Sequence, residues 1–151
     1  MTPQALSAGC AWLNEAGVRP TRQRVVLAAL LVGDGHNRHV TAESLHAAAC
    51  DAGESISLAT VYNTLSTFCD AGLMREITVS GLRNYYDTNT QDHPHFYWED
   101  TRTITDAPLP ELEIARLPRH PADTEVVRVD VVIRIRRCSK RNRSDPSAFP
   151  Q

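Results

Sequence analysis

The apolar pattern of this chain changes its period at Gly72, and the change limits the folds that the chain can adopt. Before Gly72, apolar residues recur three and four positions apart, which is the spacing of one helix face. After Gly72, they alternate with polar residues, as in a strand with one buried face. The order of helices first and strands second predicts an α+β fold.

Short helices are expected before Gly72 over residues 3–16, 20–32, 41–52 and 57–71. The third begins at Thr41, whose side chain can cap a helix start, and glycines follow the helix ends. Cys10, Cys50 and Cys69 are expected on or beside the apolar helix faces, as core residues. In the last helix the apolar positions are Leu58, Val61, Leu65 and Phe68.

Two predicted strands follow the helices, with the sequences "LMREITV" and "RNYYD". The residues Ser80-Gly81-Leu82 separate them, so the pair reads as a hairpin. Four short helices and a hairpin form the order expected of a winged helix-turn-helix domain with one extra leading helix. We assign residues 1–88 to this predicted DNA-binding domain.

Residues 89–138 predict a small second domain, and the polar tail 139–151 is expected to be disordered. The segments "HFYWE" and "RTITD" can pair as a hairpin, with Phe96 and Trp98 pointing into the sheet. Residues 109–117 predict a short helix, and residues 125–136 alternate as a strand. The apolar face of that strand carries Val127, Val129, Val131, Ile133 and Ile135. So small a sheet buries little apolar area alone, so a homodimer is expected.

The solvent-facing side of the helix over residues 57–71 suits the major groove of DNA. Thr60 and Ala59 offer methyl groups to thymine, and Asn63 can pair with adenine, which favours A/T-rich sites. The predicted DNA contacts are Arg19, Arg22, Ser57, Ala59, Thr60, Tyr62, Asn63 and Arg83. Arginines hold phosphates, and Arg83 on the hairpin can reach the minor groove. The alternative is that these side chains only form a solvated helix face.

Composition suits a soluble globular protein, with 42% hydrophobic and 23% charged residues. The formal net charge of −2 gives no general sign of nucleic-acid binding. No apolar run approaches the roughly 20 residues that cross a bilayer, and no signal peptide is recognisable, so a cytoplasmic protein without a membrane partner is expected. The cysteines form no C-x-x-C pair, which argues against a disulfide scaffold or a cysteine-rich zinc site, and Cys138 is expected to be exposed.

The segment "DHPHFYW", residues 92–98, carries a His-x-His pair. In an extended chain, residues two apart project on the same side at about 6–7 Å, so His93 and His95 can converge on one metal ion. Pro94 stiffens that geometry. The alternative is a pair of surface or hydrogen-bonded histidines. His36, His46 and His120 are read as surface residues.

Several stretches resemble the Fur superfamily of dimeric metal-responsive repressors in order and spacing. They read "GVRPTRQRVVLAALL", "HVTAESLHAA", "SLATVYNTLSTFCDAGLMRE" and "NYYDTN". Within the superfamily, the chain looks closest to the Irr subgroup, the iron response regulators of alphaproteobacteria. The resemblance implies a winged-helix domain, a dimerisation domain, and regulation of iron and haem genes at A/T-rich inverted repeats of double-stranded DNA.

The resemblance also implies a regulatory metal site formed by His39, Asp87, His93 and His95. Three imidazoles and a carboxylate suit zinc, iron or manganese. Haem is the second candidate cofactor, with His93, His95 or Cys10 as its ligand. The chain lacks the Cys-Pro dipeptide of haem-binding Irr proteins, and it has His93-Pro94-His95 where that subgroup tends to have three histidines.

The predicted function is therefore a DNA-binding regulator whose affinity responds to haem or a divalent metal. One alternative is a metal-dependent regulator without haem sensing, and another is a haem- or metal-buffering protein that no longer reads DNA. An enzyme is not expected, because the chain has no nucleophile elbow, no H-E-x-x-H motif and no glycine loop for phosphates.

Overall fold

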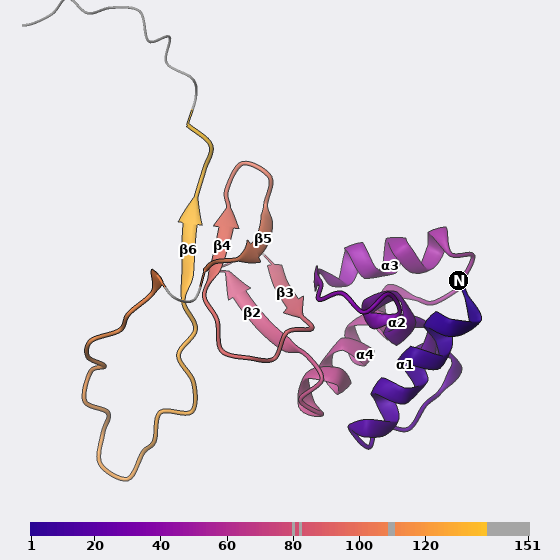
Figure 1. The fold of residues 1–151 in the computed structure, drawn as a ribbon, viewed down its shortest axis with the longest axis horizontal. Coiled ribbons are helices and arrows are strands. Elements are labelled where there is room, and N and C mark those ends of the chain that lie inside the picture. Colours follow the sequence, from indigo (N-terminus) through magenta and orange to yellow (C-terminus); the bar gives the residue numbers. More distant parts are fainter. Residues whose placement is uncertain (80, 82, 109–110, 139–151) are drawn as a thin grey trace, which may run out of the picture.

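The computed structural model describes residues 1–79, 81, 83–108 and 111–138. Helices gather at one end of the molecule and strands at the other (Figure 1). The helices are α1 Pro3–Glu15, α2 Arg22–Val32, α3 Ala42–Asp51 and α4 Leu58–Asp70. The expected order of helices and then strands is confirmed, and the fold is α+β.

Each helix begins after a hydroxyl side chain that caps it. The four N-caps are Thr2, Thr21, Thr41 and Ser57, and each side-chain oxygen accepts a hydrogen bond from a backbone N–H of the first turn. At Thr41 the cap is reciprocal, because the Ser44 hydroxyl accepts from the Thr41 backbone N–H at 2.9 Å. Such caps satisfy N–H groups that have no partner within the helix.

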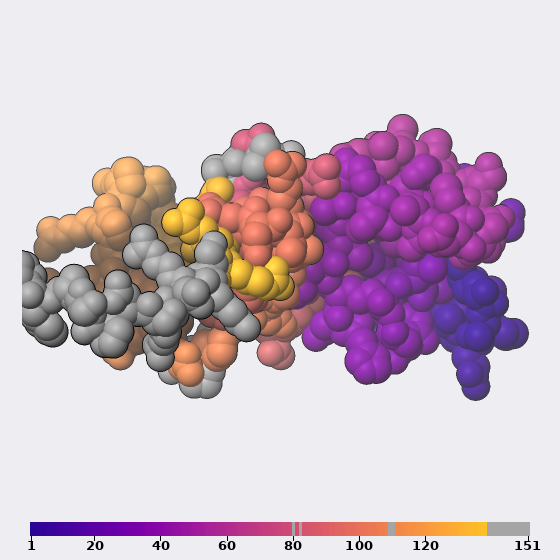
Figure 2. Space-filling view, turned by 90° about the horizontal axis from the view of Figure 1, so that it is seen from above, coloured from indigo at the N-terminus to yellow at the C-terminus, as the bar shows by residue number. Residues whose placement is uncertain are grey.

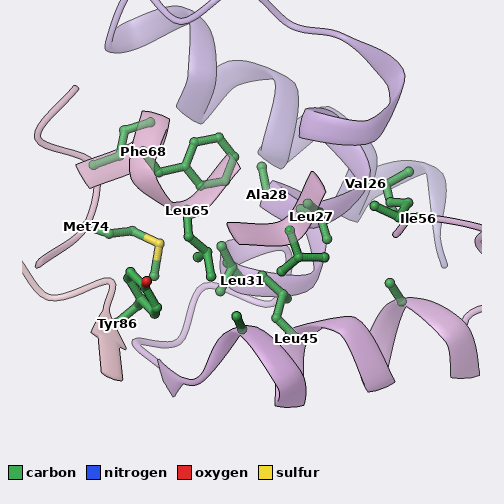
Figure 3. Packing of buried hydrophobic residues seen from close by; sticks show 14 of the residues in the cluster. Val26, Leu27, Ala28, Leu31, Leu45, Ile56, Leu65, Phe68, Met74 and Tyr86 are labelled. Atoms are coloured by element: carbon green, nitrogen blue, oxygen red, sulfur yellow. The ribbon is translucent and has the colours of Figure 1, made fainter. Parts of the chain in front are cut away.

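The helices enclose a hydrophobic cluster that we call the helical core, seen from close by in Figure 3. Leu65 and Phe68 on α4 are fully buried in it with Leu27 and Leu31 of α2. The apolar spacing of α4 predicted this face correctly except at Leu58, which stays 37% exposed at the helix start. The helical core therefore forms from residues of the first half of the chain and their neighbours up to Tyr86.

The cysteine predictions hold in part. Cys69 packs partly buried against the helical core, and Cys10 is half-buried on α1. Cys50 is exposed, so its prediction as a core residue is wrong. It lies in the last turn of α3, on the side away from Leu45 and Ala49, which hold that helix to the core. Cys138 is exposed, as predicted.

The first sheet contains the predicted hairpin and one strand that the sequence did not predict. Strands β2 Arg75–Val79 and β3 Arg83–Asp87 pair antiparallel, which confirms the hairpin. Strand β1, His39–Val40, pairs antiparallel with the other edge of β3 and gives the order β1-β3-β2. Its register sets His39 opposite Asp87.

The second sheet has the order β5-β4-β6. The hairpin of β4 His95–Trp98 and β5 Thr103–Asp106 is confirmed, and its register sets His95 opposite Asp106. Strand β6, Val132–Ile135, lies parallel to β4 on its other side.

The predicted strand over residues 125–136 is mostly absent: only β6 forms, and Val127 is 89% exposed. Alternation alone does not make a strand where no neighbour supplies backbone hydrogen bonds. The predicted helix is also wrong over residues 112–117, where the chain is irregular; residues 109 and 110 lie outside the described residues. So short a segment does not hold a helix without a packed face, and Ile114 and Leu117 are about half exposed, at 47% and 50%.

The inward face of β4 is the opposite of the one predicted. Tyr97 is 3% exposed and packs with Ile77, Val79, Tyr85 and Ile104 in a second cluster, which we call the sheet core. Phe96 and Trp98 are half-buried on the other face. Side chains two apart share a face, so the buried position of His95 brings Tyr97 inward with it.

The sheet core spans both sheets, since Ile77, Val79 and Tyr85 come from the β2–β3 hairpin and Tyr97 and Ile104 from β4 and β5. It joins the helix-bearing part to the second sheet. None of the helices in the described part of the chain is long and apolar enough to span a membrane.

Candidate metal centre and nucleic-acid interface

Five side chains that can ligate a metal meet where the two sheets adjoin. They are His39, Asp87, His93, His95 and Asp106, and their ligand atoms all lie within 4.8 Å of one another. We call this group the His/Asp cluster. Four members sit on strands β1, β3, β4 and β5, whereas His93 lies on the irregular segment between β3 and β4.

Strand register accounts for most of the geometry. Pairing of β1 with β3 sets His39 beside Asp87, and pairing of β4 with β5 sets His95 beside Asp106. A side-chain hydrogen bond between His95 Nε2 and Asp87 Oδ2, at 3.1 Å, then links the two sheets.

One carboxylate oxygen lies at the centre of the His/Asp cluster. Asp87 Oδ2 is 3.0 Å from the Nε2 of His93, 3.1 Å from that of His95 and 3.2 Å from that of His39. Asp106 Oδ1 is 2.9 Å from His93 Nε2 and 3.0 Å from His39 Nε2. All three Nε2 atoms therefore point at the same pair of carboxylates.

Electrostatics keeps Asp87 ionised although its side chain is fully buried. Burial raises the pKa of Asp87, but hydrogen bonds with His39, with His95 and with the backbone N–H of Asn89 lower it well below its usual range. Burial lowers the pKa of His39, but the Asp87 carboxylate beside it outweighs burial, so the pKa is raised. Each of these charged forms thus stabilises the other.

The residues present fit a divalent metal ion. His39 Nε2 is buried beside two carboxylate oxygens, 3.2 Å from Asp87 Oδ2 and 3.0 Å from Asp106 Oδ1, where a metal ion would replace its proton. His93 has its other ring nitrogen, Nδ1, 2.7 Å from the Gln91 carbonyl oxygen, which favours the tautomer with its proton on Nδ1 and leaves Nε2 facing the carboxylates. Imidazole nitrogens with carboxylate oxygens are ligands typical of zinc, iron and manganese.

The four residues implied by the resemblance, His39, Asp87, His93 and His95, are brought together. Sequence reasoning missed the fifth, Asp106. The signal was present, because "RTITD" was expected to pair with "HFYWE", and that pairing ends with Asp106 across from His95.

The other histidines and Cys10 lie outside the His/Asp cluster. His36 and His120 are exposed, as expected, while His46 is half-buried with its Nε2 3.8 Å from the Cys50 sulfur. The Cys10 sulfur lies 3.6 Å from the Asn14 side-chain nitrogen within α1, so the structure does not group Cys10 with the two cluster histidines.

The exposed face of α4 carries the side chains predicted to meet DNA. Ala59, Tyr62 and Asn63 are exposed, and Thr60 is half-buried with its backbone N–H capped by Ser57 at 3.1 Å. Arg19 shares one surface hollow with Thr60 and Asn63, together with Thr21, Gln23 and Arg24. Basic side chains and the start of α4 therefore face the same space, while contact with DNA stays a prediction.

A second hollow joins α3, α4 and the hairpin. The Tyr62 hydroxyl donates a 2.8 Å hydrogen bond to Glu43 Oε1, and Arg83 lines the same hollow. This hydrogen bond lowers the pKa of Glu43 and raises the pKa of Tyr62. Sequence reasoning missed Glu43 as a partner of Tyr62, because nothing in the sequence relates two residues on separate helices.

Comparison with known proteins gives consistent results for sequence and fold. Residues 15–133 match the model of the ferric uptake regulator family. The peroxide-responsive repressor PerR of Staphylococcus aureus (strain USA300) is 36% identical over 122 residues, covering 80% of this chain and 81% of that protein.

Among solved structures, the ferric uptake regulator of Pseudomonas aeruginosa with manganese is similar, with a TM-score of 0.65 and 26% identity over 87% of this chain and 98% of that one. A zinc-bound manganese uptake regulator gives a TM-score of 0.62 and 26% identity, covering 85% of this chain and 98% of that one.

Proposed function

The chain belongs to the ferric uptake regulator family of non-enzymatic, DNA-binding transcriptional regulators, and we propose that a divalent metal ion at the His/Asp cluster controls its affinity for DNA. The observation that carries the proposal is the convergence of three imidazole Nε2 atoms and two carboxylates from both sheets. His39, Asp87, His93, His95 and Asp106 would hold the ion, which supplies a positive centre between the two carboxylates.

The position of the cluster explains how an ion would act on DNA binding. His39 comes from β1, which follows α2 directly and pairs with β3, while His95 and Asp106 belong to the second sheet. An ion shared by these residues would fix the helical part against the second sheet. In a dimer, that orientation sets the spacing of the two α4 helices, which must match two half-sites on DNA.

The proposed operator is an A/T-rich inverted repeat read by a dimer. Residues 1–88 would form the DNA-binding domain and residues 89–138 the dimerisation domain. Within the first, Ala59, Thr60, Tyr62 and Asn63 would meet base edges, while Arg19 and Arg22 would hold phosphates. Arg83 on the hairpin would reach the minor groove. Ser57 would keep the start of α4 in place through its cap on Thr60.

Of the two effectors predicted from the sequence, the cluster favours a metal ion over haem, and the placement in the Irr subgroup gains no support. His95 is 6% exposed, and the His93 and His95 Nε2 atoms lie about 3 Å from Asp87. Axial ligation of haem would require these side chains to leave the carboxylates. Manganese and zinc accompany two similar structures, and iron has the same ligand preferences.

Response to peroxide is a second candidate function. It is supported by the 36% identity over 122 residues to a peroxide-responsive repressor. If it holds, peroxide should release the iron-loaded protein from DNA and leave the zinc-loaded protein bound, since zinc has no redox chemistry.

A binding titration tests the main proposal. Metal-free protein and protein loaded with manganese, zinc or iron(II) are titrated onto an A/T-rich inverted repeat at fixed salt, with and without haem, beside the His39→Ala variant. We expect tight, sequence-selective binding only with metal, and loss of metal dependence in His39→Ala. Equal affinity with and without metal would exclude metal control, and release by haem alone would favour the haem effector.

A further inference from the structure

One ligand of the His/Asp cluster is held differently from the rest. Backbone pairing between strands fixes His39, Asp87, His95 and Asp106. His93 lies in the segment 88–94, which is not a strand, although the ends of this segment make backbone hydrogen bonds: Thr88 N–H donates to the Arg38 carbonyl at 3.1 Å, and Ala107 N–H donates to the Pro94 carbonyl at 2.9 Å. Some other interaction must therefore hold the His93 imidazole, whose side chain is only 8% exposed, against Asp87 and Asp106.

That segment is shaped by hydrogen bonds between residues two positions apart. The backbone N–H of Asn89 donates to Asp87 Oδ1 at 2.8 Å, and the backbone N–H of Gln91 donates to Asn89 Oδ1 at 3.2 Å. His93 Nδ1 then lies 2.7 Å from the Gln91 carbonyl oxygen. The three hydrogen bonds link residue 87 to 89, 89 to 91, and 91 to 93. Together they connect the ligand Asp87 to the ligand His93.

Arg75 on β2 secures the same segment from outside. Its guanidinium makes a 2.6 Å ion pair with Asp92 Oδ1 and donates to the Gln91 carbonyl oxygen at 3.4 Å. Arg75 also pairs with Asp87 in the β2–β3 register. The Gln91 backbone is thus held at both of its polar groups: its N–H donates to Asn89 Oδ1, and its carbonyl accepts from Arg75.

We propose that Asn89 is a positioning residue for the metal site, holding His93 in its ligand geometry through the Gln91 backbone. This inference rests on the proposed metal binding. Asn89 Oδ1 accepts from the Gln91 N–H and so limits how the Gln91 backbone can turn; with the proton on His93 Nδ1, the Gln91 carbonyl accepts it and Nε2 is directed into the cluster. Asparagine suits this role because its side chain readily bonds a backbone N–H two residues on.

The role has a specific consequence for the ligand set. Without the Asn89 side chain, the four strand-borne ligands keep their places, and His93 alone loses part of its support. Removal of Asn89 should therefore resemble removal of His93 and not loss of the whole site. Partners of this kind typically change metal affinity by about 10- to 100-fold.

The experiment compares full-length wild type with Asn89→Ala, Asn89→Asp and His93→Ala, each titrated with Co²⁺ as a spectroscopic probe and with Mn²⁺ against a chelator. We expect Asn89→Ala to bind about 10- to 100-fold more weakly and to give the visible Co²⁺ spectrum of His93→Ala. Asn89→Asp keeps an acceptor oxygen in the same position and should restore affinity and spectrum towards wild type.

A double variant makes the test independent of general destabilisation. If Asn89 acts through His93, Asn89→Ala should cost no further affinity in the His93→Ala background. Additive losses, or a wild-type spectrum and affinity in Asn89→Ala, would overturn the role of Asn89 while leaving metal binding intact. Failure of wild type itself to bind Co²⁺ or Mn²⁺ would overturn the proposed function and this inference with it.

Discussion

The helical part and the segment after β5 carry similar apolar patterns but use them differently. In the helices, most of the patterned positions are buried in the helical core or pack against it. Every residue from 113 to 130 is exposed, including Ile114, Val127 and Val129. Figure 2 shows this segment, in orange, extending away from the rounded helical part. One part therefore completes its core within one chain, and the other leaves apolar side chains uncovered.

The contrast teaches that an apolar pattern predicts which side chains are to be buried. It does not predict whether they are buried within one chain or at an interface with a second. Regulators of this family bind their operators as dimers. A second copy is thus the natural cover for the exposed face that includes Val129 and Ile133, which are 41% and 38% exposed. The helical part should therefore stay folded when the dimer dissociates, whereas the second part should lose stability.

The largest expected effect is that of Leu65→Ala in the helical core. Leu65 is fully buried, so the substitution leaves a cavity and should lower the free energy of unfolding by about 2–5 kcal/mol. The matched variant Ile133→Ala should barely change the stability of the single chain but should weaken dimerisation. Urea unfolding at several protein concentrations measures both. Equal, concentration-independent losses would show that Ile133 is covered within one chain.

Next in size is the effect of Tyr62→Ala, which tests whether the helical part alone reads DNA. The substitution removes a base-facing ring and should weaken specific binding by about 1–3 kcal/mol, measured by gel-shift titration. Tyr62→Phe keeps the ring and loses only the bond to Glu43, so it should bind nearly as wild type. Unchanged affinity in Tyr62→Ala would remove the residue from the interface.

A smaller effect concerns pH and the cluster where the two parts meet. Because the pKa of His39 is raised, its charged form stabilises the metal-free protein below about pH 6.5 and that stability is lost as pH rises through the raised pKa. The pKa of Asp87 is lowered, so its contribution persists above the usual carboxyl pKa and is lost only in strong acid. Thermal melts should therefore show lower stability at about pH 8 than at about pH 6.

Asp87→Asn provides the control for this pH effect. The variant removes the carboxylate that raises the pKa of His39, so most of the difference between the two pH values should disappear. A difference that persists in Asp87→Asn would have to come from groups outside the His/Asp cluster.

The smallest stability effect is expected at the surface of the helical part. Arg22 pairs with Glu54 at 2.9 Å, but its side chain is 83% exposed, so Arg22→Gln should cost less than about 1 kcal/mol of stability. The same variant should lower the salt dependence of DNA binding by about one counterion. Glu54→Gln breaks the same ion pair and should leave that salt dependence unchanged, and equal effects of both would contradict the phosphate contact.

Sequence alone could predict the features that depend on local spacing. The helices followed from apolar positions such as Val61 and Leu65, and both hairpins from alternation and turn residues. Strand β1 could not be predicted, because His39 and Val40 carry no pattern of their own and form a strand only through pairing with β3. Asp106 is different: the predicted hairpin already implied its place across from His95, but sequence reasoning did not extend the register of that hairpin to further ligands.

The errors in the second part have a common physical cause. Residues 112–117 and 125–131 show helical or alternating patterns, yet most of their apolar side chains stay exposed within one chain, Ile114 at 47% and Val127 at 89%. The reversed face of β4 follows from its contact with the β2–β3 hairpin, which buries Tyr97. A pattern of half-apolar residues does not reveal which face meets which neighbour.

Strand β3 limits how much the sequence of this chain can change during evolution. Its consecutive residues Tyr85, Tyr86 and Asp87 belong in turn to the sheet core, the helical core and the His/Asp cluster. Each of these three residues contacts a separate set of neighbours. A replacement at one of them therefore needs compensating changes in its own set, and those changes do not help the other two. We therefore expect these three residues to change less than the rest of the chain. Relatives that differ elsewhere should keep this short stretch.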